Sequence, residues 1–241
     1  MKSFVKPANG FTMIEMLFTA FIFTVIAGTV FSLLLSSQMR YQSESDLTTA
    51  FQQANVAIDQ ITRDVHSAGY PSASSFNEPS TMTYHPELIA LPFAWSSGYP
   101  YTPCTVGATC TIPRDYDLIL EADVGNGLGV QFIRYSLSGT TLMRGMVSKS
   151  TNPMDPVGAT NGALTPYLDN VMNGPGNKST AIFSYTPDRD ASGLYPLSYP
   201  PSNIREVNVC LIVQSAKPDP QTGQFRSITL TGQAIRFNPN K

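Results

Sequence analysis

A single apolar run near the N-terminus constrains this chain more than any other feature of its sequence. Residues 11–35 read FTMIEMLFTAFIFTVIAGTVFSLLL and contain one charged side chain, Glu15. As an α-helix, this run would extend about 37 Å at roughly 1.5 Å per residue, which exceeds the hydrocarbon core of a bilayer at about 30 Å. The sequence therefore predicts a membrane-spanning helix, preceded by a short segment whose only charged residues are Lys2 and Lys6.

Glu15 is the anomaly in this run, because a carboxylate in a bilayer costs about 2–3 kcal/mol or more unless it finds a positive partner. A secretory signal would have an apolar stretch of roughly 7–15 residues followed by a cleavage site of small residues. Here the stretch is longer, and the small residue, Gly10, precedes it. An uncleaved signal anchor is the alternative: it would explain the length and the basic flank, but not the glutamate.

Residues 10–16, GFTMIEM, resemble the class III signal of type IV prepilins and type II secretion pseudopilins. The resemblance implies that prepilin peptidase, a membrane aspartyl protease, cleaves between Gly10 and Phe11 and methylates the new amino group of Phe11. Residues 1–10 would then be a leader peptide. It also implies a role for Glu15 in subunit assembly. Paired with the Phe11 amine of a neighbouring subunit, its carboxylate would set the axial stagger of a filament, through a contact that propagates instead of closing.

Residues 36–67 carry a different pattern. The segment 36–66 contains no proline or glycine, and Gly69 and Pro71 then supply a helix stop signal. Apolar residues recur at steps of three and four, which draws one helical stripe: Leu47, Phe51, Ala54, Ile58, Ile61 and Val65. The sequence therefore predicts one helix over about residues 12–67. The half at 11–35 would lie in the membrane or the assembly, and the amphipathic half at 36–67 would have one face covered by a globular domain.

The end of this helix carries a second resemblance. Residues 61–70, ITRDVHSAGY, are similar to the stretch that ends the long helix in PilW-like minor pilins and J-type pseudopilins. The resemblance implies a larger minor subunit and not merely a pilin in general. Without it, Arg63 and Asp64 would be interpreted as a solvated helix end, and that alternative stays open.

Residues 68–241 are predicted to form a β-rich globular domain. Runs with strand character occur at 116–122, 129–137, 141–147, 181–186, 204–214 and 225–237. Ser138 and Gly139 favour a hairpin between the second and third of these runs. A helix followed by mainly antiparallel strands is an α+β arrangement, in which a sheet packs on the amphipathic half of the helix. Several strand sequences also resemble those of PilW-type minor pilins, and the resemblance implies a type IV pilin-like fold.

Two segments, 71–115 and 148–178, are rich in Pro, Ser, Thr, Asn and Gly and are predicted to be long surface loops. Loops of this length are often binding surfaces, but here we favour the interpretation that they only cover the surface of the domain. The first contains Cys104 and Cys110, for which we predict a disulfide, since bonds of this kind persist outside the cytoplasmic membrane and no second ligand pair with zinc spacing lies nearby. Cys210 lies in a predicted strand and is interpreted as a small buried residue.

The sequence gives little support to catalysis or to nucleic-acid binding. The net charge of −2 provides no basic footprint. The two histidines, His66 and His85, belong to no zinc-protease motif, and no G-x-S-x-G occurs. Three acidic pairs lack the spacing of a calcium loop and are interpreted as charged loop ends: Asp115/Asp117, Glu121/Asp123 and Asp188/Asp190. We expect no catalytic residue, no cofactor and no metal site.

The hypothesis that follows is a minor type IV pilin, similar to the PilW kind, whose helices pack to initiate or cap a pilus. Its implied partners are other pilins, prepilin peptidase and the inner membrane before assembly. Its implied location is a single pass through that membrane, with the globular domain in the periplasm, and then the pilus or pseudopilus. The alternatives are a J-type pseudopilin of a type II secretion system, an adhesive module displayed on a pilus, and a membrane-anchored enzyme.

Overall fold

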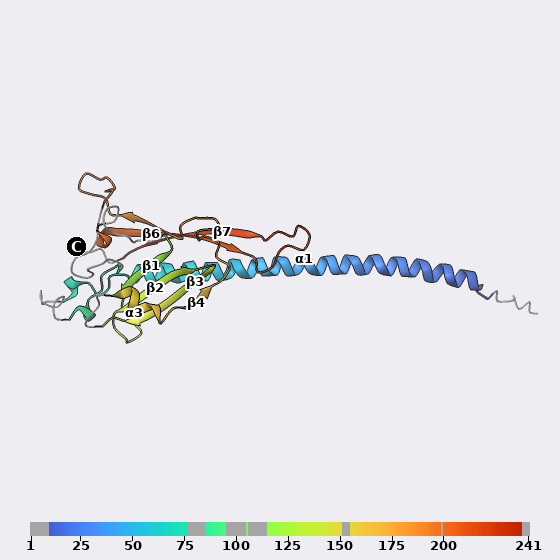
Figure 1. The fold of residues 1–241 in the computed structure, drawn as a ribbon, viewed down its shortest axis with the longest axis horizontal. Coiled ribbons are helices and arrows are strands. Elements are labelled where there is room, and N and C mark those ends of the chain that lie inside the picture. The colour runs from blue at the N-terminus through green and yellow to red at the C-terminus, as the bar shows by residue number, and fades with distance from the viewer. Residues whose placement is uncertain are drawn as a thin grey trace, which may run out of the picture.

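The computed structural model describes residues 10–76, 85–94, 105, 115–150, 155–198 and 200–237. A single long helix, α1, spans Met13–Ser67 and projects far beyond a globular part built from two antiparallel sheets (Figure 1). Its 55 residues correspond to about 82 Å at roughly 1.5 Å per residue. The predicted α+β arrangement, a long N-terminal helix followed by antiparallel strands, is confirmed, and the helix bounds agree with the expected 12–67 to within one residue.

The first sheet has four antiparallel strands in the order β1-β2-β3-β4. Its strands are β1 (Asp117–Ala122), β2 (Gln131–Ser138), β3 (Thr141–Ser148) and β4 (Thr165–Leu168). The predicted hairpin is present as β2 and β3, with Ser138 paired to Thr141. Gly139 in the connecting turn has a φ of +62°, a conformation that glycine adopts without strain.

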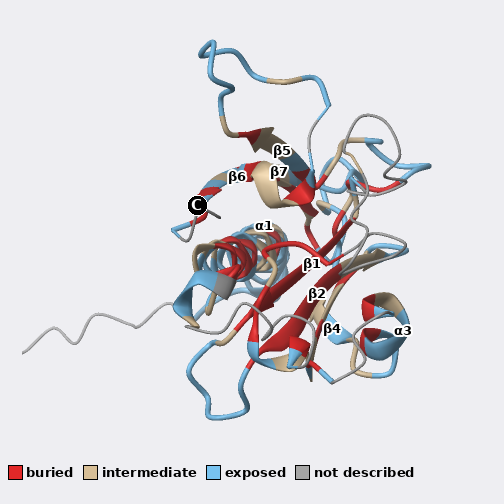
Figure 2. Cartoon of the chain, turned by 90° about the vertical axis from the view of Figure 1, so that its left-hand side faces the viewer, coloured by how far each residue is buried: buried red, intermediate tan, exposed pale blue. Residues whose placement is uncertain are grey.

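The second sheet has three antiparallel strands in the order β5-β6-β7. Its strands are β5 (Phe183–Pro187), β6 (Ile204–Gln214) and β7 (Ser227–Ile235). The strands thus divide into two sheets where the sequence suggested one. The reason is the position of α1, which contacts β6 and β7 on one side and β1 and β4 on the other. Figure 2 shows the helix end-on between the two sheets.

The helix contributes a buried stripe to the core. The buried residues of α1 that belong to this core are Ala54, Ala57, Ile58, Ile61 and Val65. Four of them belong to the stripe predicted from the sequence. Leu47 is only partly covered, and Phe51 is 42% exposed. The sheets therefore enclose the helix from about Ala54 onward.

One glycine sets how closely the second sheet approaches the helix. At Gly232 in β7, an added Cβ would lie 2.3 Å from the Cγ2 atom of Ile58 in α1. Because Ile58 is branched at Cβ, its methyl group cannot swing away without a change of χ1 rotamer. The absence of a side chain at Gly232 is thus a condition for the packing of β7 against α1.

The two segments predicted to be long loops contain regular structure. Segment 148–178 holds helix α3 (Pro156–Asn161) and strand β4, so the loop prediction is wrong for this segment. Segment 71–115 holds two 3-10 helices, η1 (Ala73–Ser75) and η2 (Pro86–Leu88), and Phe93 forms a bridge with Leu120 at the edge of β1. A third 3-10 helix, η3 (Pro201–Asn203), precedes β6.

Candidate assembly interface

The first half of α1 is an uncovered apolar surface. All residues from Met13 to Leu35 are exposed, including Met13 at 86% and Phe23 at 73%. In the part of the chain that the structure describes, α1 is the one helix long and apolar enough to cross a membrane. An apolar surface of this extent is not stable in water and marks a membrane or protein contact. The helix is therefore divided into an exposed half and a half docked between the sheets.

The three threonine side chains within the exposed half are satisfied within the helix. The Thr19 hydroxyl donates to the Glu15 carbonyl oxygen at 2.9 Å, and the Thr24 hydroxyl donates to the Ala20 carbonyl at 2.8 Å. The Thr29 hydroxyl bonds in the same way to Ile26 at 2.8 Å. Such bonds remove the cost of placing hydroxyl groups in hydrocarbon. The Glu15 carboxylate is the one charge left in this half.

The predicted processing site lies immediately before the helix. Gly10 and Phe11 have no regular secondary structure, and Phe11 is 82% exposed. Thr12 is the N-cap of α1 and has an extended backbone. The Gly10–Phe11 peptide bond therefore lies outside the helix and is exposed, as a protease requires of the bond that it cleaves.

Glu15 caps the N-terminus of α1 by forming a capping box with Thr12. One carboxylate oxygen, Oε2, accepts hydrogen bonds from the Thr12 backbone N–H and from the Thr12 hydroxyl, both at 2.9 Å. In return, the Glu15 N–H donates to the Thr12 hydroxyl at 3.4 Å. This pairing satisfies helix N–H groups that lack an intrahelical partner. The second oxygen, Oε1, accepts no hydrogen bond from the described residues, so Glu15 retains a free acceptor.

The docked end of α1 is held by a buried acid. Asp64 is 3% exposed, and its Oδ2 accepts a 2.5 Å hydrogen bond from the Tyr135 hydroxyl in β2. The same oxygen accepts from Nη2 of Arg144 in β3 at 2.9 Å, and Oδ1 accepts from Gln60 at 2.8 Å. The solvated-end interpretation is therefore wrong for Asp64, although it holds for the exposed Arg63. Asp64 ties the helix to two strands at once.

The groups around Asp64 reinforce one another. Arg144 Nε donates to the Tyr135 hydroxyl at 2.9 Å, and the guanidinium lies 5.6 Å and 6.0 Å from the ring centroids of Tyr135 and Tyr167. Burial, and then the adjacent Asp64 carboxylate, raises the pKa of Tyr135 far above its usual range. Tyr135 therefore keeps its proton and serves as a donor to Asp64 at any physiological pH.

Two further buried ion pairs lie in the first sheet, where the sequence indicated charged loop ends. Asp117 in β1 accepts two bonds from Arg134 in β2, from Nε at 2.9 Å and from Nη2 at 2.7 Å. Glu121, also in β1, accepts from the Lys149 ammonium at 2.8 Å, and both side chains are fully buried. The loop-end interpretation is therefore wrong for Asp117 and Glu121. The signal that sequence reasoning missed is their alternate spacing in an apolar strand, which places them on one face of β1.

The surroundings of Glu121 shift its protonation. Burial is the largest cause and raises its pKa to about 7, while Lys149 and the Leu91 backbone N–H act in the opposite direction.

Asp123 and Asp190 behave as expected of loop residues, since they accept hydrogen bonds from backbone N–H groups two residues further along, at Gly125 and Ser192. Burial raises the pKa of Cys210, a partly exposed free thiol in β6.

The predicted disulfide cysteines, Cys104 and Cys110, lie outside the described residues. In the described ranges, no group of three His, Cys, Asp or Glu side chains is arranged to hold a metal ion. Of the residues predicted as sites, Gly10, Phe11 and Glu15 lie close together at the N-terminus of α1.

Comparison with known proteins gives one family match. Residues 6–31 match the family described as the prokaryotic N-terminal methylation motif, the type IV pilin-like signal. This motif indicates a protein of the type IV pilin or pseudopilin class, for which assembly with other pilins and processing by prepilin peptidase are the associated events. The match covers the candidate processing site, Glu15 and most of the exposed half of α1. Neither a curated protein nor a solved structure matches the chain.

Proposed function

We propose that this chain is a minor type IV pilin of the PilW-like kind, a structural subunit that helps initiate or cap pilus assembly. The observation that carries the proposal is the division of α1: an entirely exposed apolar half, Met13–Leu35, bears one acid, Glu15, and the chain's own sheets enclose the same helix only from about Ala54 onward. The chain covers its own docked half and leaves the exposed half to be covered by lipid and, after assembly, by the helices of other subunits.

The processing step in this proposal is cleavage between Gly10 and Phe11 by prepilin peptidase, followed by N-methylation of Phe11. The match of residues 6–31 to the methylation motif supports it, and so does the exposed, non-helical chain at the bond. Lys2 and Lys6 precede the apolar run and favour retention of the leader on the cytoplasmic side. The globular domain is then on the periplasmic side of the inner membrane.

The assembly step is the pairing of Glu15 with the Phe11 amine of a neighbouring subunit. Oε2 of Glu15 is engaged by Thr12, while Oε1 has no donor among the described residues. An incoming ammonium group can therefore bind Oε1 without breaking the capping box. In lipid this pairing removes the free-energy cost of an unpaired carboxylate. Because the donor and the acceptor belong to different subunits, the pairing also sets the axial position of one subunit relative to the other.

Substitution of Gly10 and Glu15 in the native host tests the two steps separately. Gly10→Ala should block cleavage, so that the protein keeps the mass of its leader, whereas Gly28→Ala, in open space on the same helix, should be processed normally. Glu15→Ala should be cleaved but absent from sheared filaments, and the exposed acid Glu44 provides the matched control as Glu44→Ala. Incorporation of Glu15→Ala at the normal level would refute the pairing.

A J-type pseudopilin would contain the same helix and the same acid. Deletion of the gene distinguishes the two systems: we expect loss of pili with protein secretion intact. Loss of secretion with pili retained would instead assign the chain to a type II secretion system.

A further inference from the structure

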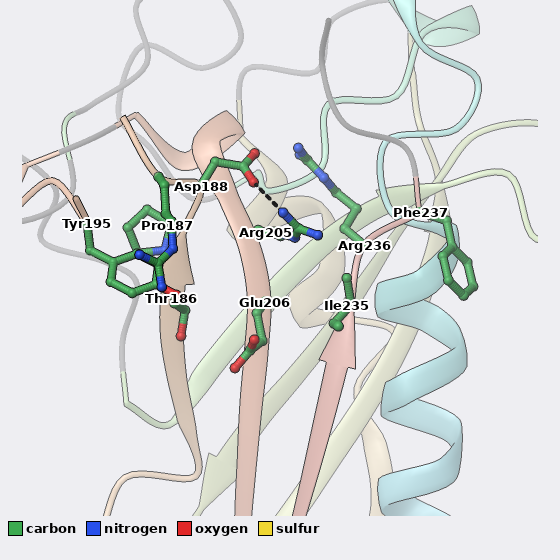
Figure 3. Close-up of a pocket in the computed structure, with 10 residues that line it drawn as sticks. Thr186, Pro187, Asp188, Tyr195, Arg205, Glu206, Ile235, Arg236 and Phe237 are labelled. Carbon is green, nitrogen blue, oxygen red and sulfur yellow. Dashed lines mark ion pairs between the residues drawn. The ribbon is translucent and has the colours of Figure 1, made fainter. Parts of the chain in front are cut away.

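A cavity of about 730 Å³ lies at the end of the second sheet that is remote from the exposed half of α1 (Figure 3). The end of β5, the start of β6 and the residues that follow β7 line it. Its position relative to α1 is fixed by Phe237, whose N–H donates to the His66 carbonyl oxygen in the last turn of α1. The Phe237 ring also packs against the His66 ring, with a tilt of 38° and 4.2 Å between centroids. The cavity belongs to neither the processing site nor the helix surface used for assembly.

Arg236 is the unusual residue of this cavity. It is 5% exposed, and its Nε and Nη1 are buried without a hydrogen-bond acceptor among the described residues. Burial lowers the pKa of Arg236, while nearby Asp188 acts in the opposite direction. A guanidinium remains charged at physiological pH, and a buried charge without a hydrogen-bonded partner is strongly unfavourable. Such an arrangement fits a site whose anion is supplied by a ligand.

The neighbouring arginines are already engaged. Arg205 forms an ion pair with Asp188 at 3.6 Å. The Arg189 guanidinium donates to the Gly193 carbonyl oxygen at 2.8 Å and lies 4.5 Å from the centroid of the Tyr195 ring. With Glu206 as the remaining acid, the lining carries one more positive than negative side chain. The excess suits a ligand with a single negative charge.

Two exposed aromatic rings flank the charged groups. Tyr195 is 52% exposed and Phe237 is 68% exposed, and both line the cavity. The volume lies within the range of small-molecule sites, about 300–1,000 Å³. A guanidinium matches the planar geometry of a carboxylate through two parallel N–H bonds. The flat rings offer apolar faces on which the C–H groups of a sugar can stack.

We propose that this cavity binds the carboxylate of an acidic sugar, with Arg236 as the residue that anchors the carboxylate. The inference does not depend on filament assembly, because every residue used lies in the globular part. It also places a binding site away from 71–115 and 148–178, the two segments that the sequence predicts to be surface loops. The free subunit and the assembled subunit should both bind.

Titration calorimetry on the full chain, in micelles of a neutral polyoxyethylene detergent that itself contains no sugar, tests the proposal. Glucuronate should bind at one site per chain, and glucose should not. Arg236→Met should weaken glucuronate binding about tenfold or more, since a charged hydrogen-bonding group is lost. Arg226→Met, at an exposed arginine outside this cavity, should leave the affinity unchanged. Absence of glucuronate binding, or equal binding by Arg236→Met, would overturn the proposal.

Competing probes identify the source of the anion. Inorganic phosphate should compete weakly with glucuronate, and equal competition would show a general anion site instead of a sugar-acid site. A triglutamate peptide that binds more tightly than glucuronate would replace the sugar with an acidic protein segment. Either result overturns the assignment to an acidic sugar.

Thermal unfolding separates a ligand-binding role of Arg236 from a structural one. In the absence of ligand, Arg236→Met should raise the unfolding midpoint, because it replaces an unpaired buried charge with an apolar side chain of similar length. Glucuronate that saturates the unmodified protein should raise its midpoint, and the same concentration should raise the midpoint of the variant by less. A lowered midpoint for ligand-free Arg236→Met would mean that Arg236 stabilises the fold by itself, and the proposal would fail.

Discussion

The two halves of α1 have different environments although they form one continuous helix. From Met13 to Leu35 every residue is exposed, and the single charge, Glu15, is paired only with its own N-cap. From Ala54 to Val65 one face is enclosed by two sheets, and the single buried charge, Asp64, bonds to side chains of β2 and β3. Each half thus contains one acid in an apolar setting. The docked acid finds its partners within the chain, whereas the other acid has a free oxygen.

This difference shows that apolar residues on a helix do not by themselves stabilise the domain to which the helix belongs. The exposed half contributes apolar surface to the membrane or to other subunits, while the docked half contributes to the folding free energy of this chain. Substitutions of the same kind in the two halves should therefore give different results. The free energy of unfolding of each variant can be measured by urea unfolding of the full chain in neutral detergent. The near-ultraviolet circular dichroism of the globular part serves as the signal.

The largest loss of unfolding free energy is expected for Asp64→Ala. The substitution leaves the Tyr135 hydroxyl and the half-buried Arg144 without their shared acceptor, and breaking a buried pair costs about 3–5 kcal/mol. The free energy of unfolding should fall by that amount. Asp59→Ala, at an exposed acid on the same helix, should change it by less than about 0.5 kcal/mol. Equal effects of the two substitutions would mean that Asp64 does not hold the helix to the sheet.

A matched pair of isoleucines tests the comparison most directly. Ile61 is 0% exposed in the docked half, and Ile22 is 53% exposed in the other half. Ile61→Ala should lower the free energy of unfolding by about 2–5 kcal/mol through lost burial and an unfilled cavity. Ile22→Ala should stay within about 0.5 kcal/mol of the unmodified protein. A comparable loss for Ile22→Ala would show that the exposed half takes part in domain folding.

A smaller loss is expected when a methyl group is added at the contact between β7 and α1. Gly232→Ala places a Cβ against the branched side chain of Ile58, and overpacking of this kind costs about 1–3 kcal/mol. Gly28→Ala in the exposed half has open space around the new methyl group and should not destabilise the domain. A neutral result for Gly232→Ala would indicate that the sheet and helix can move apart without cost.

The most gradual effect is a change of the free energy of unfolding with pH, at most about 1.4 kcal/mol for each pH unit for one group. Glu121 has a pKa of about 7 in the folded chain against an ordinary value of 4.5, so the folded state holds this proton more tightly than the unfolded state. The stability that results is complete below pH 4.5 and is lost as the pH rises through 7. Glu121→Gln should flatten this decline, whereas Glu15→Gln should leave it unchanged. Parallel profiles for Glu121→Gln and the unmodified protein would contradict the shifted pKa.

Patterns of apolar residues predicted the elements well. Uninterrupted spacing of three and four, with a glycine and proline stop, placed the end of α1 at Ser67, where the structure has it. The strands with clear alternation, above all β6 at 204–214, have the bounds expected from the sequence. Strand β4 was missed because it is four residues long, contains Pro166 and lies in a polar segment. Periodicity gives little signal when an element holds no more than two repeats of its pattern.

Pairing between distant residues was the part that the sequence did not reveal. The partition of the strands into two sheets depends on where α1 lies, which no local pattern encodes. The partners of Asp64, Glu121 and Asp117 are 80, 28 and 17 residues away along the chain. A charge in a strand is usually solvated, so single-residue reasoning favoured the exposed interpretation. The candidate processing site at Gly10 and Phe11 and the candidate assembly residue Glu15 could, by contrast, be proposed from the sequence, because the three residues are close together in it.

The seating of α1 between two sheets has a mechanical consequence. Strands β6 and β7 run beside the helix and nearly along its axis (Figure 1). A tensile force applied through the exposed end of α1 is therefore borne as shear, with the Asp64 bonds and the contact between Ile58 and Gly232 loaded together. Contacts loaded in parallel must break at once, whereas contacts that are peeled break one by one. The geometry makes the junction between helix and domain resistant to a pull along the helix axis.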